Sequence, residues 1–87
     1  MHIWISYLQI DTVIEAKLRR KHNLTGELVR DAIENVKNLT VYRVENTGYG
    51  EKYHVIGSDT HGNLISAYVE SRDPNDGFFI LRTAKYL

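Results

Sequence analysis

The sequence predicts an α+β fold in which an N-terminal strand and two helices pack on one face of a small antiparallel β-sheet. Three observations support this prediction. Between residues 12 and 37 the apolar residues recur at helical spacing, whereas outside that region they alternate as in half-buried strands. Residues with strong turn preferences are concentrated between the alternating segments. Helices and strands kept apart along the chain are typical of α+β folds. The 87 residues correspond to a single domain covering residues 1–87.

Both predicted helices lie in the N-terminal half of the chain. The first covers residues 12–22, where Asp11 and Thr12 are both N-cap candidates and Thr12 with Glu15 fits a capping box. The second covers residues 26–37 and follows Thr25, a residue type that caps helix N-termini. Its broad apolar face predicts that this second helix lies across the sheet. The face is formed by Leu28, Val29, Ala32, Ile33 and Val36.

The central predicted element is a β-hairpin over residues 51–70, in which residues with high β propensity alternate on both sides of an Asp-Thr-His-Gly turn. Its first strand carries Tyr53 on one face and Lys52 and His54 on the other. If the helices cover the Tyr53 face, the Lys52 face is left open. Further strands are predicted at residues 2–9, 40–45 and 78–83, with a loop at residues 46–50 and a turn at residues 71–77.

The composition excludes several functional classes. The chain has no cysteine, and therefore no disulfide, thiolate nucleophile or thiolate metal ligand. Its four histidines lack the short spacing of zinc sites, and its glycines form no phosphate or dinucleotide loop, so we expect no metal and no cofactor. No run of about twenty apolar residues is present, and the N-terminus resembles a strand more than a signal peptide. These observations predict a cytoplasmic protein without a membrane segment.

Several short motifs follow one another in a definite order. They are Lys21-His22 at the end of the first helix, the Thr25-capped helix with Glu27 and Val29, Lys52-Tyr53-His54 in the hairpin, Gly62-Asn63-Leu64 after its turn, and Thr83-Ala84-Lys85 near the end of the chain. Their order and spacing resemble the BrnT-like toxins, small proteins of the RelE ribonuclease superfamily. The resemblance extends from Ile14 onward. Lysine stands at Lys52 and Lys85, where arginine is common in this family.

The resemblance implies the toxin of a type II toxin–antitoxin pair. Such a toxin cleaves RNA without a metal and is held inactive by an antitoxin protein, here expected from a neighbouring gene. Metal-free cleavage uses the 2′-hydroxyl of the RNA as the nucleophile, so the protein supplies a proton acceptor, a proton donor and cations for the charge growing on the phosphate. The predicted catalytic residues are Lys52, His54, Arg82 and Lys85, and the predicted RNA-binding residues are Lys21, His22, Arg43 and Tyr86.

Each candidate also has a purely structural explanation. Exposed lysines and arginines usually serve solubility alone, His22 suits the C-terminal end of its helix, and His54 fits a half-buried position in a sheet. The formal net charge of zero favours a second interpretation, because proteins that bind nucleic acid are usually basic. In that interpretation the protein is a non-catalytic protein-binding module of the same fold, which associates with a partner chain or with a second copy of itself through a sheet edge.

Overall fold

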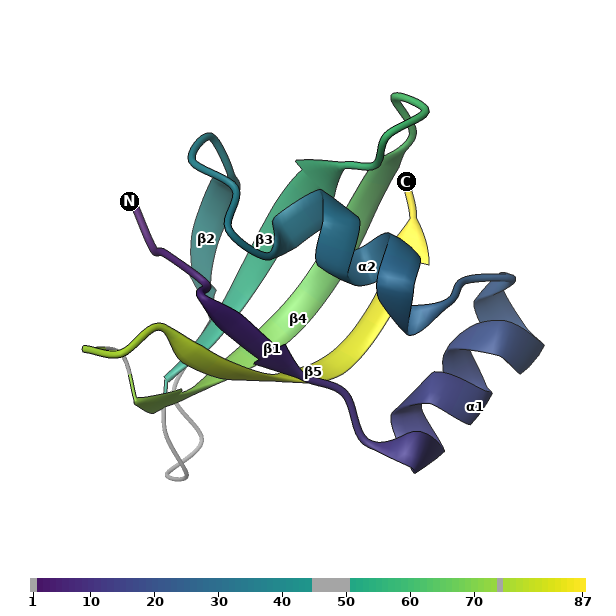
Figure 1. Ribbon diagram of the computed structural model, residues 1–87, viewed down its shortest axis with the longest axis horizontal. Helices are drawn as coiled ribbons and strands as arrows, with labels where there is room; N and C mark the ends of the chain where they lie inside the picture. The colour runs from purple at the N-terminus through teal and green to yellow at the C-terminus, as the bar shows by residue number, and fades with distance from the viewer. Residues whose placement is uncertain (1, 45–50, 74) are drawn as a thin grey trace.

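The computed structural model describes residues 2–44, 51–73 and 75–87. They form two helices and five strands (Figure 1), which confirms the prediction of an α+β fold. The predicted loop at residues 46–50 lies outside the described residues, as do one residue of the predicted turn and the last residue of the predicted strand 40–45. The elements in chain order are β1 (Tyr7–Gln9), α1 (Thr12–His22), α2 (Gly26–Ile33), β2 (Thr40–Val44), β3 (Lys52–Ser58), β4 (Leu64–Asp73) and β5 (Phe78–Tyr86).

The five strands form one mixed sheet in the order β1-β5-β4-β3-β2. The four strands from β2 to β5 pair antiparallel, as predicted. The N-terminal strand differs from the prediction, because it is an edge strand of the sheet and runs parallel to β5. The strand β1, Tyr7–Gln9, is also shorter than the strand predicted at residues 2–9. Tyr7 already pairs with Phe78, the first residue of β5, so the residues before Tyr7 extend past the end of their partner strand.

The ends of the helices are set by contacts with neighbouring segments. Of the two N-cap candidates of α1, Asp11 occupies the N-cap position. The capping box of Thr12 and Glu15 does not form, and Glu15 instead accepts a hydrogen bond from the Gly26 N–H at 2.6 Å. Thr25 caps α2 as predicted, accepting from the Leu28 N–H at 3.2 Å. The predicted α2 extended to residue 37 but the helix ends at Ile33.

The early end of α2 follows from its contacts with the N-terminal segment. Glu34 leaves the helix with an extended backbone, and its carboxylate accepts a hydrogen bond from the Leu8 N–H at 2.9 Å. The Asn35 N–H then donates to the Ile5 carbonyl at 2.7 Å. The Glu34 N–H still donates to the Arg30 carbonyl, so the helical hydrogen bonds stop at Asn35, whose N–H is bound to Ile5 instead.

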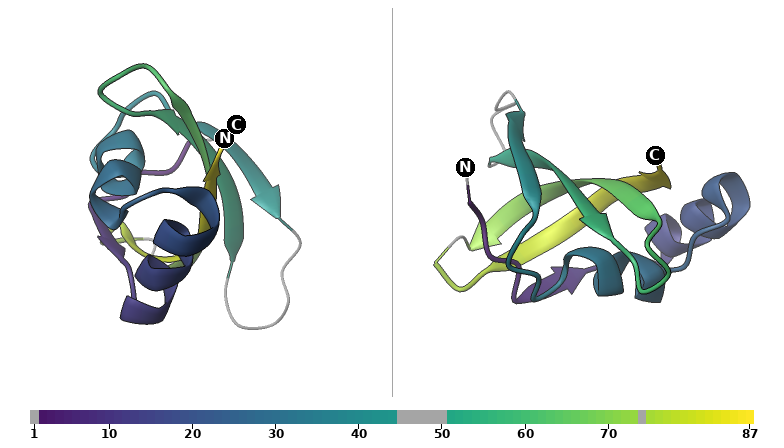
Figure 2. Two further views of the ribbon diagram at one scale, coloured as in Figure 1. Left: turned by 90° about the vertical axis from the view of Figure 1, so that its right-hand side faces the viewer. Right: turned by 90° about the horizontal axis from the view of Figure 1, so that it is seen from above.

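Both helices lie on the same side of the sheet (Figure 2). Tyr53, Val55 and Gly57 of β3 are buried on this side, whereas Lys52 and His54 point to the other. The Lys52 face is therefore the one left open. The helix α2 crosses β3 at Gly57, where an added Cβ would lie 2.1 Å from the Ala32 carbonyl oxygen. The fully buried centre of the core includes Ile5, Leu8, Leu18, Leu24, Val29, Ile33, Val55, Ile65, Val69, Phe79 and Leu81.

The two edges of the sheet are protected differently. At β1, the Leu8 N–H donates to Glu34, and the guanidinium of Arg30 donates to the Leu8 carbonyl at 3.1 Å. At β2, no other segment within the described part of the chain bonds to the outer edge of Thr40–Val44. An uncovered edge of this kind can accept a strand from another chain. The described helices, of 11 and 8 residues, are both too short to cross a bilayer.

Candidate functional site

The face of the sheet turned away from the helices carries Lys52, His54 and Lys85, three of the predicted catalytic residues, and we call it the open face. Its residues follow from the cross-strand register, because directly paired residues point to the same side. Three rows cross the strands from β2 towards β5. They are Val44, Lys52 and Glu70; then Tyr42, His54, Tyr68 and Thr83; then Thr40, Ile56, Ser66 and Lys85.

The middle row contains three rings in contact, of which His54 and Tyr68 are stacked and Tyr42 is tilted against His54. The ring centroids of His54 and Tyr68 are 4.6 Å apart with an interplanar angle of 8°, and those of Tyr42 and His54 are 5.7 Å apart. The His54 Nε2 also lies 2.5 Å from the Ser66 Oγ. Its imidazole is therefore fixed between two tyrosines and oriented by a hydroxyl. This confirms the half-buried position expected for His54 and places it on the open face.

Positive charge flanks this row on both sides. On one side, Lys52 pairs with Glu70, and the Arg82 Nε lies 3.5 Å from the Glu70 Oε2. On the other side, Lys85 pairs with Ser66, the residue that contacts His54. All four predicted catalytic residues thus lie around one part of the sheet. Lys52 and Arg82 lie beside Glu70, and Lys85 lies beside Ser66, which is four residues or about 13 Å away along β4. His54 lies between these two positions.

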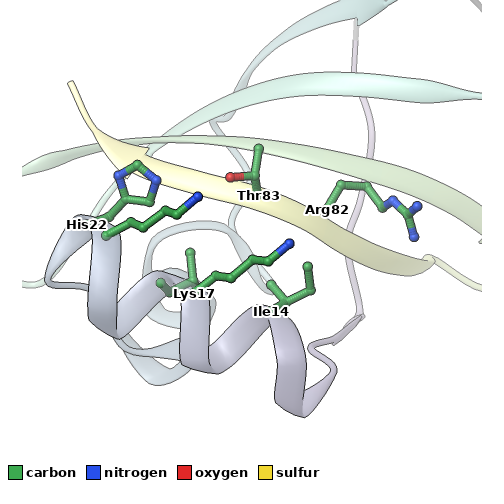
Figure 3. A pocket seen from close by; sticks show the side chains of 7 residues that line it. Ile14, Lys17, His22, Arg82 and Thr83 are labelled. Atoms are coloured by element: carbon green, nitrogen blue, oxygen red, sulfur yellow. The ribbon is translucent and has the colours of Figure 1, made fainter.

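A basic pocket of about 220 Å³ lies where α1 runs alongside the C-terminal half of β5 (Figure 3). The strand β1 pairs with β5 only up to Ile80, so α1 takes the place of a neighbouring strand beyond that residue. None of the described residues that line the pocket carries a carboxylate. These residues are Ile14, Lys17, Leu18, Lys21, His22, Arg82 and Thr83.

Local structure explains why the cations meet in this pocket. Lys17 and Lys21 are four residues apart on α1, so they lie on one side of the helix, and both line the pocket beside β5. On β5, a β-bulge places Arg82 between the paired residues Leu81 and Thr83 and leaves it without a partner in β4. A bulge redirects the side chain of its extra residue. Arg82 consequently borders both the pocket and the open face.

Two predicted RNA-binding residues lie elsewhere. Arg43 pairs with Tyr53, so it belongs to the helix-covered side, where it forms an ion pair with Glu51 at 2.9 Å. Tyr86 pairs with the buried Ile65 and is likewise directed away from the open face. Alternation along each strand therefore places neither predicted RNA-binding residue on the open face. The Tyr53 hydroxyl donates to Glu51, and this hydrogen bond, with burial and the nearby negative charge, raises the pKa of Tyr53.

The structure adds four residues that the sequence analysis did not select. Tyr42 and Tyr68 complete the ring stack, with 55% and 39% of their surface exposed. Lys17 lines the basic pocket, and Arg72 borders a second hollow of about 300 Å³ beside Glu70 and Arg82. For Tyr68 the sequence did contain a signal, because alternation along the hairpin places it on the same face as Lys52 and His54. The positions of Lys17 and Arg72 depend on tertiary packing and on a bulge.

No protein-family model, curated protein or solved structure matches the chain. Among the described residues, no three His, Asp or Glu side chains are grouped as they would be to hold a metal ion. The function is therefore argued from the geometry of the open face and the basic pocket.

Proposed function

We propose that this protein is an endoribonuclease toxin of a type II toxin–antitoxin pair, and that it binds RNA on the open face and in the basic pocket. One observation carries the proposal. Lys21 and His22 of α1 and Arg82 of β5 come from two distant segments of the chain, yet they line one pocket in which none of the described lining residues is acidic. A site of this kind suits the phosphate groups of a nucleic acid. Although the net charge is zero, the cations are concentrated here.

The residues beside the stacked rings have the chemical groups that metal-free RNA cleavage requires. The RNA 2′-oxygen attacks the adjacent phosphorus, a 2′-O–P bond forms, and the bond from phosphorus to the 5′-oxygen breaks. In the proposed reaction His54, oriented by Ser66, accepts the proton from the 2′-hydroxyl. The ammonium group of Lys85, on the other side of Ser66, donates a proton to the leaving 5′-oxygen. Lys52 and Arg82 offset the charge that develops on the phosphate.

The proposed partner is an antitoxin protein, and the proposed compartment is the cytoplasm, where RNA is the target. The outer edge of β2 supports a protein partner, because its backbone groups can pair with a strand of another chain. The same edge favours the second candidate function, a non-catalytic module that binds proteins or a second copy of itself. The two candidates differ in whether the isolated protein damages RNA.

The test is RNA cleavage by the purified protein in EDTA, together with growth of cells that express it with and without the neighbouring gene. We expect cleavage, growth arrest, and relief of the arrest by the antitoxin. The variants His54→Ala and Lys85→Ala should lower cleavage by about 100-fold or more. Lys37→Ala is the matched control, because Lys37 is an exposed lysine on the connection between α2 and β2. Intact RNA and normal growth would favour the binding module.

A further inference from the structure

We propose that the row Tyr42, His54, Tyr68 and Thr83 is a stacking platform for the bases of single-stranded RNA, which is laid across the strands with a phosphate in the basic pocket. This inference rests on the proposed RNA binding but not on cleavage. It assigns a role to Tyr42 and Tyr68, and it specifies unpaired RNA as the substrate class.

The register of the sheet makes the row continuous. Tyr42 pairs with His54, His54 with Tyr68, and Tyr68 with Thr83. Neighbouring strands are about 4.8 Å apart, so the row spans about 14 Å from β2 to β5. It ends at Thr83, which lines the basic pocket beside Lys21 and His22. A path therefore runs from the exposed ring of Tyr42 directly to a cluster of cations.

The exposure of the rings points to a ligand with flat faces. Tyr42 and Tyr68 each contact the His54 ring, yet 55% and 39% of their surface remains exposed. Aromatic rings presented on a sheet stack with unpaired bases in several folds that bind single strands, because every base has a π-face. The bases of a duplex are stacked on one another, so they are not available to such a platform. The rings consequently favour single-stranded over double-stranded RNA.

The charges around the row complement a nucleic acid backbone. Lys52 lies two residues from His54 on one side of the row, and Lys85 lies two residues from Thr83 on the other. Both are about 7 Å from the row along their strands. Bases held on the rings would therefore have cations within reach of their phosphates on both sides. A protein partner with an apolar surface would instead leave these charges unpaired.

The experiment measures the affinity of the whole protein for a single-stranded 2′-O-methyl oligonucleotide, which this chemistry does not cleave, by fluorescence anisotropy. We expect Tyr42→Leu and Tyr68→Leu each to weaken binding by about five- to one-hundred-fold, the range for loss of one base–aromatic stack. Tyr42→Phe and Tyr68→Phe should bind nearly as well as the original protein, because they keep the ring. A duplex of the same sequence should bind more weakly and should not depend on these tyrosines.

Tyr7→Leu is the matched control. Tyr7 is 48% exposed, but it lies on β1, where its ring contacts Phe78 rather than the row. Circular dichroism checks that each variant folds, and shifts of the Tyr42 and Tyr68 ring protons on adding the oligonucleotide test the stacking in the unaltered protein. Full binding by the two Leu variants, an equal loss in Tyr7→Leu, or unshifted ring protons would overturn the platform while leaving RNA binding intact. Failure of the unaltered protein to bind RNA would overturn both proposals.

Discussion

Arg82 and Glu70 link the two parts of the candidate site. The Arg82 Nε lies 3.5 Å from the Glu70 carboxylate on the open face, and the same arginine lines the basic pocket beside α1. Glu70 also lies directly opposite Lys52 in the register of β3 and β4. This largely buried carboxylate therefore offsets the charge of Arg82, directly across the strands from Lys52, at the point where an RNA strand would pass.

Replacing Glu70 with glutamine should strengthen RNA binding. The amide keeps the shape of the side chain but no longer offsets the charge of Arg82, and partly exposed ion pairs of this kind correspond to about two- to fivefold in affinity. The slope of log K against log salt should steepen by about 0.7 if one additional phosphate is neutralised. Arg82→Ala should weaken binding and make that slope shallower. Titrations at several salt concentrations measure both effects, and an unchanged slope in both variants would contradict the linking role.

Replacing Gly57 with alanine should destabilise the fold. The new Cβ would lie 2.1 Å from the Ala32 carbonyl oxygen, so α2 must move away from β3. Overpacking of this kind costs about 1–3 kcal/mol, or roughly 4–8 °C of Tm for each kcal/mol in a chain this small.

The matched control for Gly57 is Gly62→Ala. Gly62 has a φ of 82° but no neighbouring atom within 4 Å, so it tests backbone strain without a clash. That strain costs about 1–2 kcal/mol. Thermal unfolding of the two variants should show the larger loss at Gly57. An equal or smaller loss there would mean that α2 does not approach β3 closely.

The hairpin turn should make stability depend on acid pH. The Asp59 Oδ1 accepts hydrogen bonds from the His61 and Asn63 N–H groups at 2.8 and 2.9 Å. Burial raises the pKa of Asp59, but these backbone hydrogen bonds and one from the Asn63 side chain outweigh it, and the net effect lowers the pKa. The stabilisation is therefore present above the unfolded-state pKa, near 4, and is lost as the pH falls through the lower folded value.

Two variants separate the charge of Asp59 from its hydrogen bonds. Asp59→Asn keeps an oxygen acceptor, so it should retain most of the stability at pH 7 and lose the acid dependence due to this group. Asp59→Ala should lower the Tm at pH 7 as well. Thermal unfolding between pH 2 and pH 7 provides the measurement, and identical acid profiles for Asp59→Asn and the original protein would refute the role given to the carboxylate.

Tyr53 should ionise only at unusually high pH. Its hydroxyl donates to Glu51, and this bond, burial and the charge of Glu51 all raise the pKa of Tyr53 above its ordinary value, against a smaller opposing effect of Arg43. The corresponding stability is present below pH 10 and is lost as the pH rises through the folded value. Glu51→Gln should bring the Tyr53 titration, followed by ultraviolet absorbance, closer to its ordinary range. No change in the titration would show that Glu51 does not hold the hydroxyl.

Local patterns predicted the elements whose partners are close in sequence. The hairpin and its turn at Asp59 follow from alternation and turn chemistry, and Thr25 was identified from its preference for N-caps. Alternation separated the Tyr53 face from the Lys52 face but left open which of them the helices cover. The pairing of His54 with Tyr68 also depends only on the turn. Leucine, valine and alanine on α2 predicted the face that it buries, but not its end, which Glu34 sets through a bond to Leu8.

Local sequence patterns could not predict the features that depend on residues distant in the sequence. The strand β1 pairs with residues about 70 positions away, and no local signal shows that it joins the sheet or that it runs parallel. The basic pocket needs both the bulge at Arg82 and the position of α1 along β5. Tyr42 enters the ring row through the pairing of β2 with β3 across residues that are not described.

The central claim is that RNA contacts the open face and the basic pocket together. The most direct measurement is amide chemical-shift mapping of the isotope-labelled protein during titration with a single-stranded 2′-O-methyl oligonucleotide. We predict that the largest shifts occur at residues 17–22 of α1, at residues 82–85 of β5 and at the middle of β3 and β4. Shifts confined to α2 and the β1 edge, or no shifts at all, would contradict the account.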